Sequence, residues 1–300
     1  MPIPQSQLET WSHQGAITTS SSAYNSLREA LLKQSSPLAD RGVDIFLQGS
    51  YVNSTNIYGD SDVDVVVLYD QTFCSDVAAL SIAAQQAELA SFASATYQWS
   101  HLRDDTLSAL RAHFGQNAVS VGSKSIKVMT GYGKRPSDVV PAIGFRRFAT
   151  FVNQNNFTAH WGMQFFDSRS IPVVNYPKYH ITRGEEKNQK SRTDGNYKAT
   201  VRVFKNLRNY LIDSRLLNKD VAPSYFLECA LHTVPDSLFV GDFRDTVPAI
   251  IDYLSSGIPA NALCQNGVVP LFGSGSTQWS QDALRAFAMA TKFAWDNWYN

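Results

Sequence analysis

The sequence predicts a mixed α/β (α+β) protein of two lobes, in which the first half contains strands and helices and the second half is mainly helical. Two aspartates open an apolar strand pattern near residue 62, and a turn signal near residue 131 separates two further strand-like runs. After residue 197 the apolar residues recur at helical spacing. We therefore expect a first lobe over residues 1–150, which begins with a helix, and a helical second lobe over residues 151–300.

The first half opens with a helical pattern and then alternates between strands and helices. Residues Thr19–Lys33 begin with a Ser/Thr-rich cap, and their apolar side chains recur at helical spacing. A segment with Pro and Gly separates them from a short apolar strand over Asp44–Leu47. Beyond the aspartate-bearing strand, the patterns of Val77–Phe92 and Asp104–Phe114 predict two more helices.

A β-hairpin is predicted around residue 131. The run Ser125–Met129 leads into Gly131–Pro136, a segment of turn-forming residues, and Ser137–Ile143 continues as a strand. The aromatic-rich stretch Phe145–His180 shows no regular period, so we expect irregular structure there. Because Arg183–Asn196 is almost wholly polar, it predicts a mobile loop.

The second half predicts a series of amphipathic helices. Their apolar residues form one stripe each, with polar residues on the remaining surface. The segments are Lys198–Ile212, Pro223–His232, Phe243–Leu254 and Gln281–Trp298.

The charge balance limits the class of partner. The chain has 300 residues, with 26 Lys and Arg against 26 Asp and Glu, so its formal net charge is zero. Because a protein without excess positive charge has no global field that attracts nucleic acid, we expect no obligatory nucleic-acid partner. Nucleotides need only a local basic patch.

The cysteines and the hydropathy pattern favour a cytoplasmic protein. Cys74, Cys229 and Cys264 are scattered and lack Cys-x-x-Cys spacing, which argues against disulfides and a zinc site. The first residues lack the basic and apolar regions of a signal peptide, and no apolar run reaches membrane-spanning length. We expect no membrane partner.

The strongest functional signal is the pair Asp62 and Asp64. Alternate residues of a strand share a face, so both carboxylates point the same way, and a bound cation relieves their repulsion. Paired hard oxygen ligands suit Mg²⁺, which proteins hold through one or two carboxylates and substrate phosphates. The alternative is a half-exposed edge strand with solvated acids. The Gly49-Ser50 turn upstream and the apolar opposite face favour a phosphoryl-transfer site.

Asp138 is the candidate for a third metal ligand. It opens the strand Ser137–Ile143, which is the second strand of the predicted hairpin and can lie beside the strand of Asp62 and Asp64. A turn-capping Asp beside Pro136 explains the same residue nearly as well. With three carboxylates we expect two Mg²⁺ ions, for which Mn²⁺ can substitute: one activates the attacking hydroxyl and the other neutralises the triphosphate.

The donor triphosphate requires a cradle of phosphate contacts. Gly49 permits a close backbone approach, and Ser50 offers an N–H and a hydroxyl. Ser224 follows Pro223 at the start of a predicted helix, where free N–H groups favour a phosphate. Tyr225 can stack on a nucleobase, or it can be a core aromatic at a helix start.

A polar and basic face of one predicted helix supplies further candidate phosphate contacts. Val201, Phe204 and Leu207 occupy another face of this helix and are expected to pack inward. Simple solvation is the ordinary explanation of a basic face, and Ser224 adds weight to the phosphate interpretation. The residues of this face are Lys198, Arg202, Lys205 and Asn209.

Short motifs that span most of the chain carry a family resemblance. They are Trp11–Ala16, Gln48-Gly49-Ser50-Tyr51, Asp62-x-Asp64, Ser137-Asp138-Val139-Val140-Pro141, Tyr197–Arg208 and Pro223–Cys229. Together they resemble the bacterial CD-NTases, which are relatives of cyclic GMP-AMP synthase and oligoadenylate synthase. The combination is far more specific than any one motif.

The resemblance implies a polymerase-β-like nucleotidyltransferase lobe and a helical lobe that closes the nucleotide cleft, with the active site in that cleft. It implies Asp62, Asp64 and Asp138 as catalytic carboxylates and metal ligands. The implied nucleotide contacts are Gln48, Gly49, Ser50, Lys205, Ser224 and Tyr225, with Lys198, Arg202 and Arg208 as further candidates for phosphate contacts.

The implied function is Mg²⁺-dependent joining of nucleoside triphosphates into a cyclic di- or trinucleotide, with release of pyrophosphate, in the bacterial cytoplasm. The product would activate a downstream effector in antiphage defence, and a regulatory protein partner is left open. One alternative is a non-cyclising transferase that acts on RNA or a small molecule. The other is a nucleotide-binding scaffold without catalysis. The neutral charge counts against an RNA primer, and the three candidate carboxylates count against a scaffold.

Overall fold

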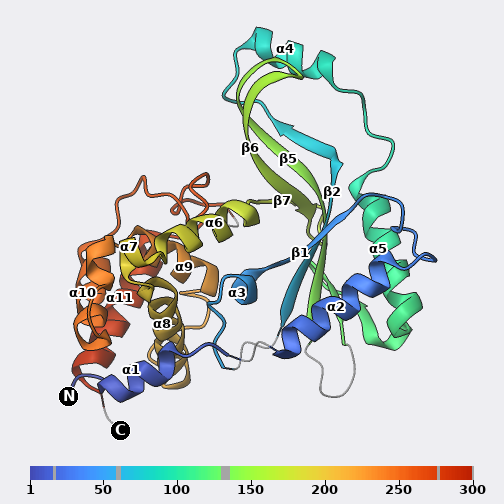
Figure 1. The fold of residues 1–300 in the computed structure, drawn as a ribbon. Coiled ribbons are helices and arrows are strands. Elements are labelled where there is room, and N and C mark those ends of the chain that lie inside the picture. The colour runs from blue at the N-terminus through green and yellow to red at the C-terminus, as the bar shows by residue number, and fades with distance from the viewer. Residues whose placement is uncertain (16–17, 59–61, 130–135, 276–277, 299–300) are drawn as a thin grey trace. The chain divides into compact units, whose positions relative to one another are not determined.

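The chain folds into two compact units, each with its own hydrophobic core. The computed structural model describes residues 1–15, 18–58, 62–129, 136–275 and 278–298. The sheet unit comprises Ile17–Gln48 and Ser61–Pro177, and the helical unit comprises Met1–Ala16, Gly49–Asp60 and Lys178–Asn300 (Figure 1). These units differ from the expected lobes of 1–150 and 151–300, because a boundary at residue 150 would cut a long strand.

The described residues of the sheet unit form a seven-stranded sheet with helices beside it. The strands are β1 (Asp44–Gln48), β2 (Val63–Asp76), β3 (Val119–Val121), β4 (Ile126–Val128), β5 (Ser137–Asn153), β6 (Asn156–Phe166) and β7 (Pro172–Asn175). The helices are α2 (Thr18–Leu32), α4 (Ile82–Ser91), α5 (Trp99–Phe114) and the short 3-10 helix η1 (Gln116–Ala118).

The sheet mixes parallel and antiparallel pairs. Its central order is β1-β2-β5-β4-β3, and β6 and β7 continue from β5. β2 and β5 run parallel, which requires a long connection, and α4, α5 and the β3–β4 hairpin lie between them in the sequence. The antiparallel pairing of β4 with β5 confirms the predicted hairpin, although residues 131–135 of its turn lie outside the described residues.

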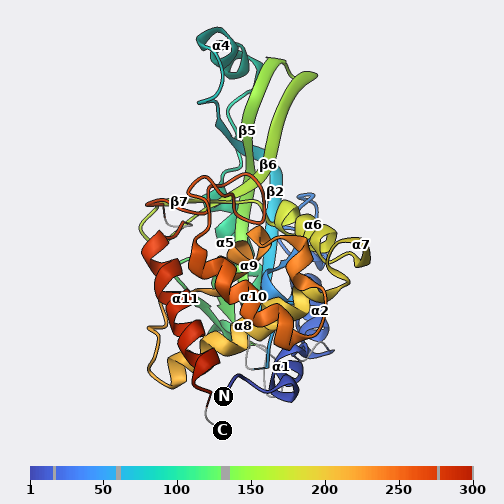
Figure 2. The same ribbon diagram turned by 90° about the vertical axis from the view of Figure 1, so that its left-hand side faces the viewer.

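The long strand β5 pairs with different strands along its length. Its first residues pair with β2 and β4, and its later residues pair with β6. Figures 1 and 2 show that β5 and β6 continue as a ribbon with α4 against its far end. Leu80, Phe148 and Phe151 form a small buried core there, against which the apolar side of α4 packs. The ribbon therefore has its own hydrophobic support.

The expectation of irregular structure over Phe145–His180 is wrong. This stretch holds the second half of β5, all of β6 and β7, and the start of α6. Register shifts interrupt the β5–β6 pairing between Phe148 and Thr150 and between Phe151 and Asn153. Such bulges break the period of two by which a strand is recognised in a sequence.

The helical unit contains most of the helices that the sequence predicted. Its elements are α1 (Gln5–Ser12), α3 (Gly49–Val52), α6 (Pro177–Lys187, whose first residue belongs to the sheet unit), α7 (Lys190–Thr193), α8 (Asn196–Asp213), α9 (Ser224–Thr233), η2 (Asp236–Phe239), α10 (Phe243–Ser256) and α11 (Gln281–Asp296). The predicted helices after residue 197 are confirmed to within a few residues at their ends.

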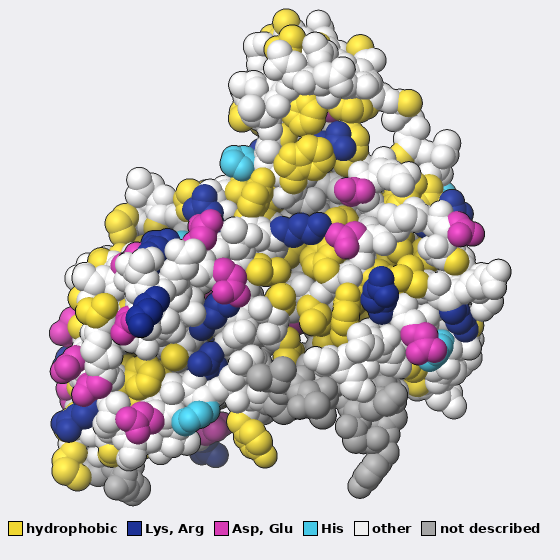
Figure 3. Space-filling view, viewed as in Figure 1, with side chains coloured by type: hydrophobic (Ala, Val, Ile, Leu, Met, Phe, Trp, Pro, Cys, Tyr) yellow, Lys and Arg dark blue, Asp and Glu magenta, His cyan; other side chains and the backbone are white. Residues whose placement is uncertain are grey.

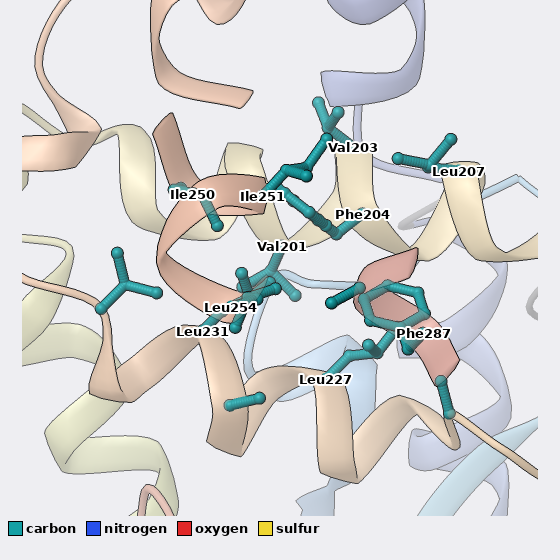
Figure 4. Packing of buried hydrophobic residues seen from close by; sticks show 14 of the residues in the cluster. Val201, Val203, Phe204, Leu207, Leu227, Leu231, Ile250, Ile251, Leu254 and Phe287 are labelled. Carbon is teal, nitrogen blue, oxygen red and sulfur yellow. The ribbon is translucent and has the colours of Figure 1, made fainter. Parts of the chain in front are cut away.

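α8 is the central helix of this unit. Val201, Phe204 and Leu207 are fully buried, which confirms the predicted inward face. Figure 4 shows these side chains among apolar residues of α9, α10 and α11, and the rings of Phe204 and Phe287 lie 6.5 Å apart. Burial of each such side chain contributes about 1.5–3 kcal/mol of transfer free energy. The core thus fixes which face of α8 carries its polar residues.

The expectation of a mobile loop over Arg183–Asn196 is also wrong, because the segment forms the end of α6 and all of α7. Lys187 is buried, and its Nζ donates hydrogen bonds to the Val234 carbonyl at 2.7 Å and to Asp236 at 2.8 Å. A polar segment is ordered here because its buried amine finds polar partners.

Candidate active site

Five polar residues lie level across neighbouring strands of the sheet unit. Gln48 of β1 pairs with Asp64 of β2, and Asp64 pairs with Asp138 of β5. Asp138 pairs with Lys127 of β4, and Lys127 pairs with Ser120 of β3. Neighbouring strands are about 4.8 Å apart, and directly paired residues project from the same face of a sheet. This set of residues, the polar row, therefore places two carboxylates side by side, with an amide on one side of them and an amine, followed by a hydroxyl, on the other.

The two carboxylates lie at the edge of an apolar sheet face. Asp64 and Asp138 are half-buried, and by alternation their faces continue along β2 and β5 with apolar residues. Those residues belong to one buried cluster, so a slip of one residue would exchange carboxylates for core side chains. The same-face residues in the cluster are Val66, Leu68, Val140 and Ala142.

The structure brings Asp64 and Asp138 together, whereas Asp62 is exposed and precedes β2 by one residue. In the described part of the chain, no three His, Cys, Asp or Glu side chains are grouped closely enough to hold a metal ion. The donor set still fits Mg²⁺, because this ion takes one or two carboxylates and completes its coordination with water and substrate phosphates. The third-ligand role of Asp62 stays a prediction.

The Gly-Ser turn of the helical unit has the conformation that glycine favours. Gly49 has a φ of 73°, in the left-handed region, and it opens the short helix α3. The Thr55 N–H donates to the Ser50 carbonyl at 2.9 Å, which folds residues 50–55 back on themselves. A side chain at position 49 would strain this turn. The backbone conformation alone therefore accounts for a glycine at this position, without a bound ligand.

A buried ion network anchors this turn in the helical unit. Glu228 of α9 accepts from Lys205 Nζ of α8 at 2.8 Å, from Thr55 Oγ1 at 2.8 Å, and lies 2.9 Å from His180 Nε2 of α6. Lys205 also donates to the Thr55 carbonyl at 3.0 Å. Burial alone would raise the pKa of Glu228, but the charge of Lys205 and the hydrogen bond with His180 outweigh burial and hold this pKa well below its ordinary value.

The predicted phosphate contacts of α8 are already engaged with protein groups. Lys205 is fully buried in the ion network, and Lys198 forms an ion pair with Glu185. The Arg202 guanidinium donates to the carbonyls of Ser12 and Ser54. These cations lie along the helix as expected, but each one is part of the packing of the helical unit.

Arg208 and Ser224 lie together at the start of α9. Arg208 Nη1 donates to Ser224 Oγ at 3.1 Å and to the Ala222 carbonyl at 3.2 Å. The sequence predicted Pro223 as the first helical residue. In the structure Pro223 is the N-cap, and the helix begins one residue later, at Ser224. A guanidinium, a hydroxyl and the N-terminus of a ten-residue helix meet here, which is an arrangement that suits a phosphate.

Tyr225 lies in an aromatic stack. Its ring stacks on His180 at a centroid distance of 5.1 Å and lies 5.8 Å from Trp279 in a tilted orientation. Its hydroxyl accepts a hydrogen bond from Asn266 at 3.0 Å, and burial raises the pKa of Tyr225 far above its ordinary value. The core-aromatic alternative accounts for these contacts, and stacking on a nucleobase stays a prediction.

Sequence reasoning missed the residues whose importance depends on the tertiary structure. Glu228 gave a usable signal, because a single acid inside the apolar run Phe226–Leu231 must find a cation when it is buried. Lys127 gave little signal, since an exposed lysine between Ile126 and Val128 is ordinary on a strand. Its place beside Asp138 depends on the register of β4 against β5.

Comparison with known proteins identifies the family. Residues 182–296 match the cGAS/DncV-like nucleotidyltransferase C-terminal helical domain, and residues 25–107 match a nucleotidyltransferase domain. A cyclic UMP-AMP synthase of Rhodothermus marinus is 42% identical over 299 residues, which cover 99% of each chain. The chain belongs to the cGAS/DncV-like nucleotidyltransferase family. It is a nucleotidyltransferase, and the family resemblance read from its motifs is confirmed.

Other members of the family match over similar lengths. A cyclic nucleotide synthase of Staphylococcus haemolyticus is 34% identical, with 99% of this chain and 100% of that protein covered. The structure of the Rhodothermus marinus c-UMP-AMP synthase with Apcpp and Upnpp has a TM-score of 0.89 at 40% identity, covering 100% of this chain and 98% of that chain. These matches confirm the predicted combination of a nucleotidyltransferase core and a helical lobe.

The face of the molecule shown in Figure 3 has no large area of charge of one sign. Acidic and basic side chains are interspersed on the face shown in Figure 3, in line with the zero net charge. Among the described helices, none is both long and apolar enough to cross a membrane.

The ion network makes a testable prediction about stability. Lys205→Met keeps the aliphatic stem but leaves the buried Glu228 carboxylate without its cation, so we expect the free energy of unfolding to fall by about 3–5 kcal/mol. Lys198→Met is the matched control, because its partner Glu185 is exposed, and we expect a loss below about 1 kcal/mol. Urea denaturation measures both free energies of unfolding. Equal losses would show that the pairing of Lys205 with Glu228 stabilises the protein no more than the pairing of Lys198 with Glu185.

Proposed function

We propose that the protein joins nucleoside triphosphates into a cyclic di- or trinucleotide and releases pyrophosphate. The observation that carries this proposal is the pairing of Asp64 with Asp138 at the edge of the sheet, in a chain related over its whole length to a cyclic UMP-AMP synthase. A carboxylate pair suits phosphoryl transfer, which asks of a protein mainly positioning and charge stabilisation. The related proteins narrow the product to a cyclic nucleotide.

In the proposed site, Asp64 and Asp138 hold Mg²⁺, with Asp62 as the third ligand of a two-ion site and Mn²⁺ able to replace Mg²⁺. When bound, the ions lower the charge on the triphosphate and the pKa of the attacking hydroxyl. The chain's own contribution is geometric, because strand pairing fixes the spacing of the two carboxylates before any ligand binds.

The proposed donor contacts follow from the environment of each candidate. Gln48, Gly49 and Ser50 are proposed to bind the donor triphosphate, for which the left-handed turn at Gly49 supports a close backbone approach. We propose Arg208 and Ser224 as a further phosphate contact, because they share a hydrogen bond at a helix N-terminus.

We propose a structural role for the remaining candidates on α8. Lys205 supports the fold through Glu228, and Lys198 and Arg202 do so through Glu185 and backbone carbonyls. Tyr225 is proposed to stack on a nucleobase, with its ring held in place by His180.

The proposed reaction has two similar steps. A 2′- or 3′-hydroxyl of one nucleotide forms a bond to the α-phosphorus of the donor, the bond to the leaving pyrophosphate breaks, and the hydroxyl proton passes to water. For a dinucleotide, the linear product then presents its own 5′-triphosphate as the donor, and its free hydroxyl attacks that α-phosphorus to close the ring and release a second pyrophosphate. For a trinucleotide, the free hydroxyl first attacks the α-phosphorus of a third nucleoside triphosphate, whose pyrophosphate leaves, before the ring closes. No covalent enzyme intermediate is required.

The proposed setting is antiphage defence in the bacterial cytoplasm, where nucleoside triphosphates are abundant. The cyclic product would act on a downstream effector protein. We propose no nucleic-acid cofactor, because the chain carries no net charge to attract one.

The central prediction concerns the product. Purified protein incubated with α-³²P-labelled nucleoside triphosphates and Mg²⁺ should yield a phosphatase-resistant product, because a cyclic nucleotide has no terminal phosphate. Asp64→Asn and Asp138→Asn should each abolish the product, whereas the exposed Asp252→Asn on α10 should not. A phosphatase-sensitive linear product would indicate a non-cyclising transferase, and nucleotide binding without turnover would indicate a scaffold.

The donor contacts make a second prediction. Arg208→Gln and Ser224→Ala should each raise KM for the nucleotide by about 10- to 150-fold, since a charge-assisted hydrogen bond to phosphate is worth about 1.5–3 kcal/mol. The exposed Lys219→Gln serves as a charge-matched control with unchanged KM. Steady-state kinetics measure the effect, and an unchanged KM in Arg208→Gln would remove this pair from the donor site.

A further inference from the structure

Lys127 lies in the polar row between Asp138 and Ser120 of β3, and neither the core nor the proposed metal and donor contacts account for it. It lies on the short strand β4 between the buried residues Ile126 and Val128, and its own side chain is exposed. Its backbone pairs with that of Asp138, so the amine projects from the face that carries the carboxylates. Among the described carboxylates, none lies within ion-pair distance of its Nζ.

The order of the polar row places different groups on the two sides of the carboxylate pair. Gln48, at one end, is a proposed contact of the donor nucleotide, and Asp64 and Asp138 occupy the middle. In phosphoryl transfer the attacking and leaving oxygens lie roughly in line on opposite sides of the phosphorus. If the leaving pyrophosphate is on the Gln48 side of the carboxylates, the attacking hydroxyl approaches from the Lys127 side.

We propose that Lys127 binds the acceptor nucleotide through its phosphate groups, an inference that rests on the proposed function. A lysine amine is a compact point charge on a flexible four-carbon stem, so it can reach a phosphate beside Asp138 without a fixed fork geometry. The acceptor is a nucleoside triphosphate in the first step and the linear dinucleotide in the second. In both steps its negative charge must be held near two carboxylates, and a cation on this side of the carboxylates offsets that repulsion.

The competing explanation is a cross-strand attraction between Lys127 and Asp138, at more than ion-pair distance, that only supports the sheet. Such an attraction would affect stability and the two substrates alike. An acceptor contact would affect one substrate and leave the other unchanged, which kinetics can separate.

The two substrates can be made chemically distinct. A 2′,3′-dideoxynucleoside triphosphate has no attacking hydroxyl, so it can serve only as the donor. An α,β-methylene nucleoside triphosphate cannot lose pyrophosphate, so it can serve only as the acceptor. Their reaction forms one bond from the acceptor hydroxyl to the donor α-phosphorus, releases pyrophosphate and stops at the linear dinucleotide.

The experiment measures KM for each substrate at a fixed concentration of the other that does not inhibit, because each analogue can also occupy the site in which it does not react. It compares the wild-type protein with variants of the full chain. Lys127→Gln should raise the acceptor KM roughly tenfold, as expected for the loss of one charge-assisted contact, and leave the donor KM within about twofold. Lys127→Arg should restore most of the acceptor affinity. The control is Lys124→Gln, an exposed lysine of the same hairpin outside the polar row, which should behave as the wild type.

A binding measurement accompanies the kinetics. Titration calorimetry with the α,β-methylene nucleotide in Mg²⁺ should show two sites in the wild type and a weakened second site in Lys127→Gln, and urea denaturation should show unchanged stability. If both KM values rise equally, or if neither changes, the acceptor role is overturned while the proposed function stands. If the wild type makes no product from ordinary nucleoside triphosphates, the proposed function fails and the acceptor role fails with it.

Discussion

The parallel pairing of β2 with β5 is the constraint on which the proposed chemistry depends. It places Asp64 level with Asp138, and the antiparallel partners of the two strands add Gln48 and Lys127 to the same line. Apolar residues on both faces of β2 hold this register, because a slip of one residue would bury carboxylates and expose valines. Hydrophobic packing away from the site therefore determines the separation of the carboxylates at the site.

The helical unit solves a different physical problem. Glu228 is a charge taken out of water, and it is tolerable only because Lys205, His180 and Thr55 surround it. The same contacts tie the Gly49 turn to α8 and α9, so a costly buried charge also orders a segment that is proposed to touch substrate. An apolar core alone could not fix this turn, because its backbone needs specific hydrogen-bond partners.

Much of the fold followed from local patterns. We predicted the helices after residue 197, the β4–β5 hairpin and the strand of Asp64. Their signals, the spacing of apolar residues and the presence of turn-forming residues, lie within each segment of the sequence. The strands within Phe145–His180 were missed because bulges disrupt their alternation. The helices within Arg183–Asn196 were missed because their order depends on partners such as Asp236, which lie far away in the sequence.

The site shows the same division between local and distant information. We anticipated that the strand of Asp138 lies beside the strand of Asp64, but the parallel register that pairs the two residues comes from the structure. The burial of Lys205 was not, because its partner Glu228 lies on another helix. The position of Lys127 also required the register, which no local pattern specifies.

The most direct test of the central claim is a measurement of metal binding. Mn²⁺ is titrated into the protein with the α,β-methylene nucleotide present, and electron paramagnetic resonance reports the free ion. If Asp64 and Asp138 hold the metal, Asp64→Asn and Asp138→Asn will each weaken Mn²⁺ binding by at least about tenfold, and Asp252→Asn will leave it unchanged. Wild-type affinity in both site variants would contradict the assignment and show that the metal is held elsewhere.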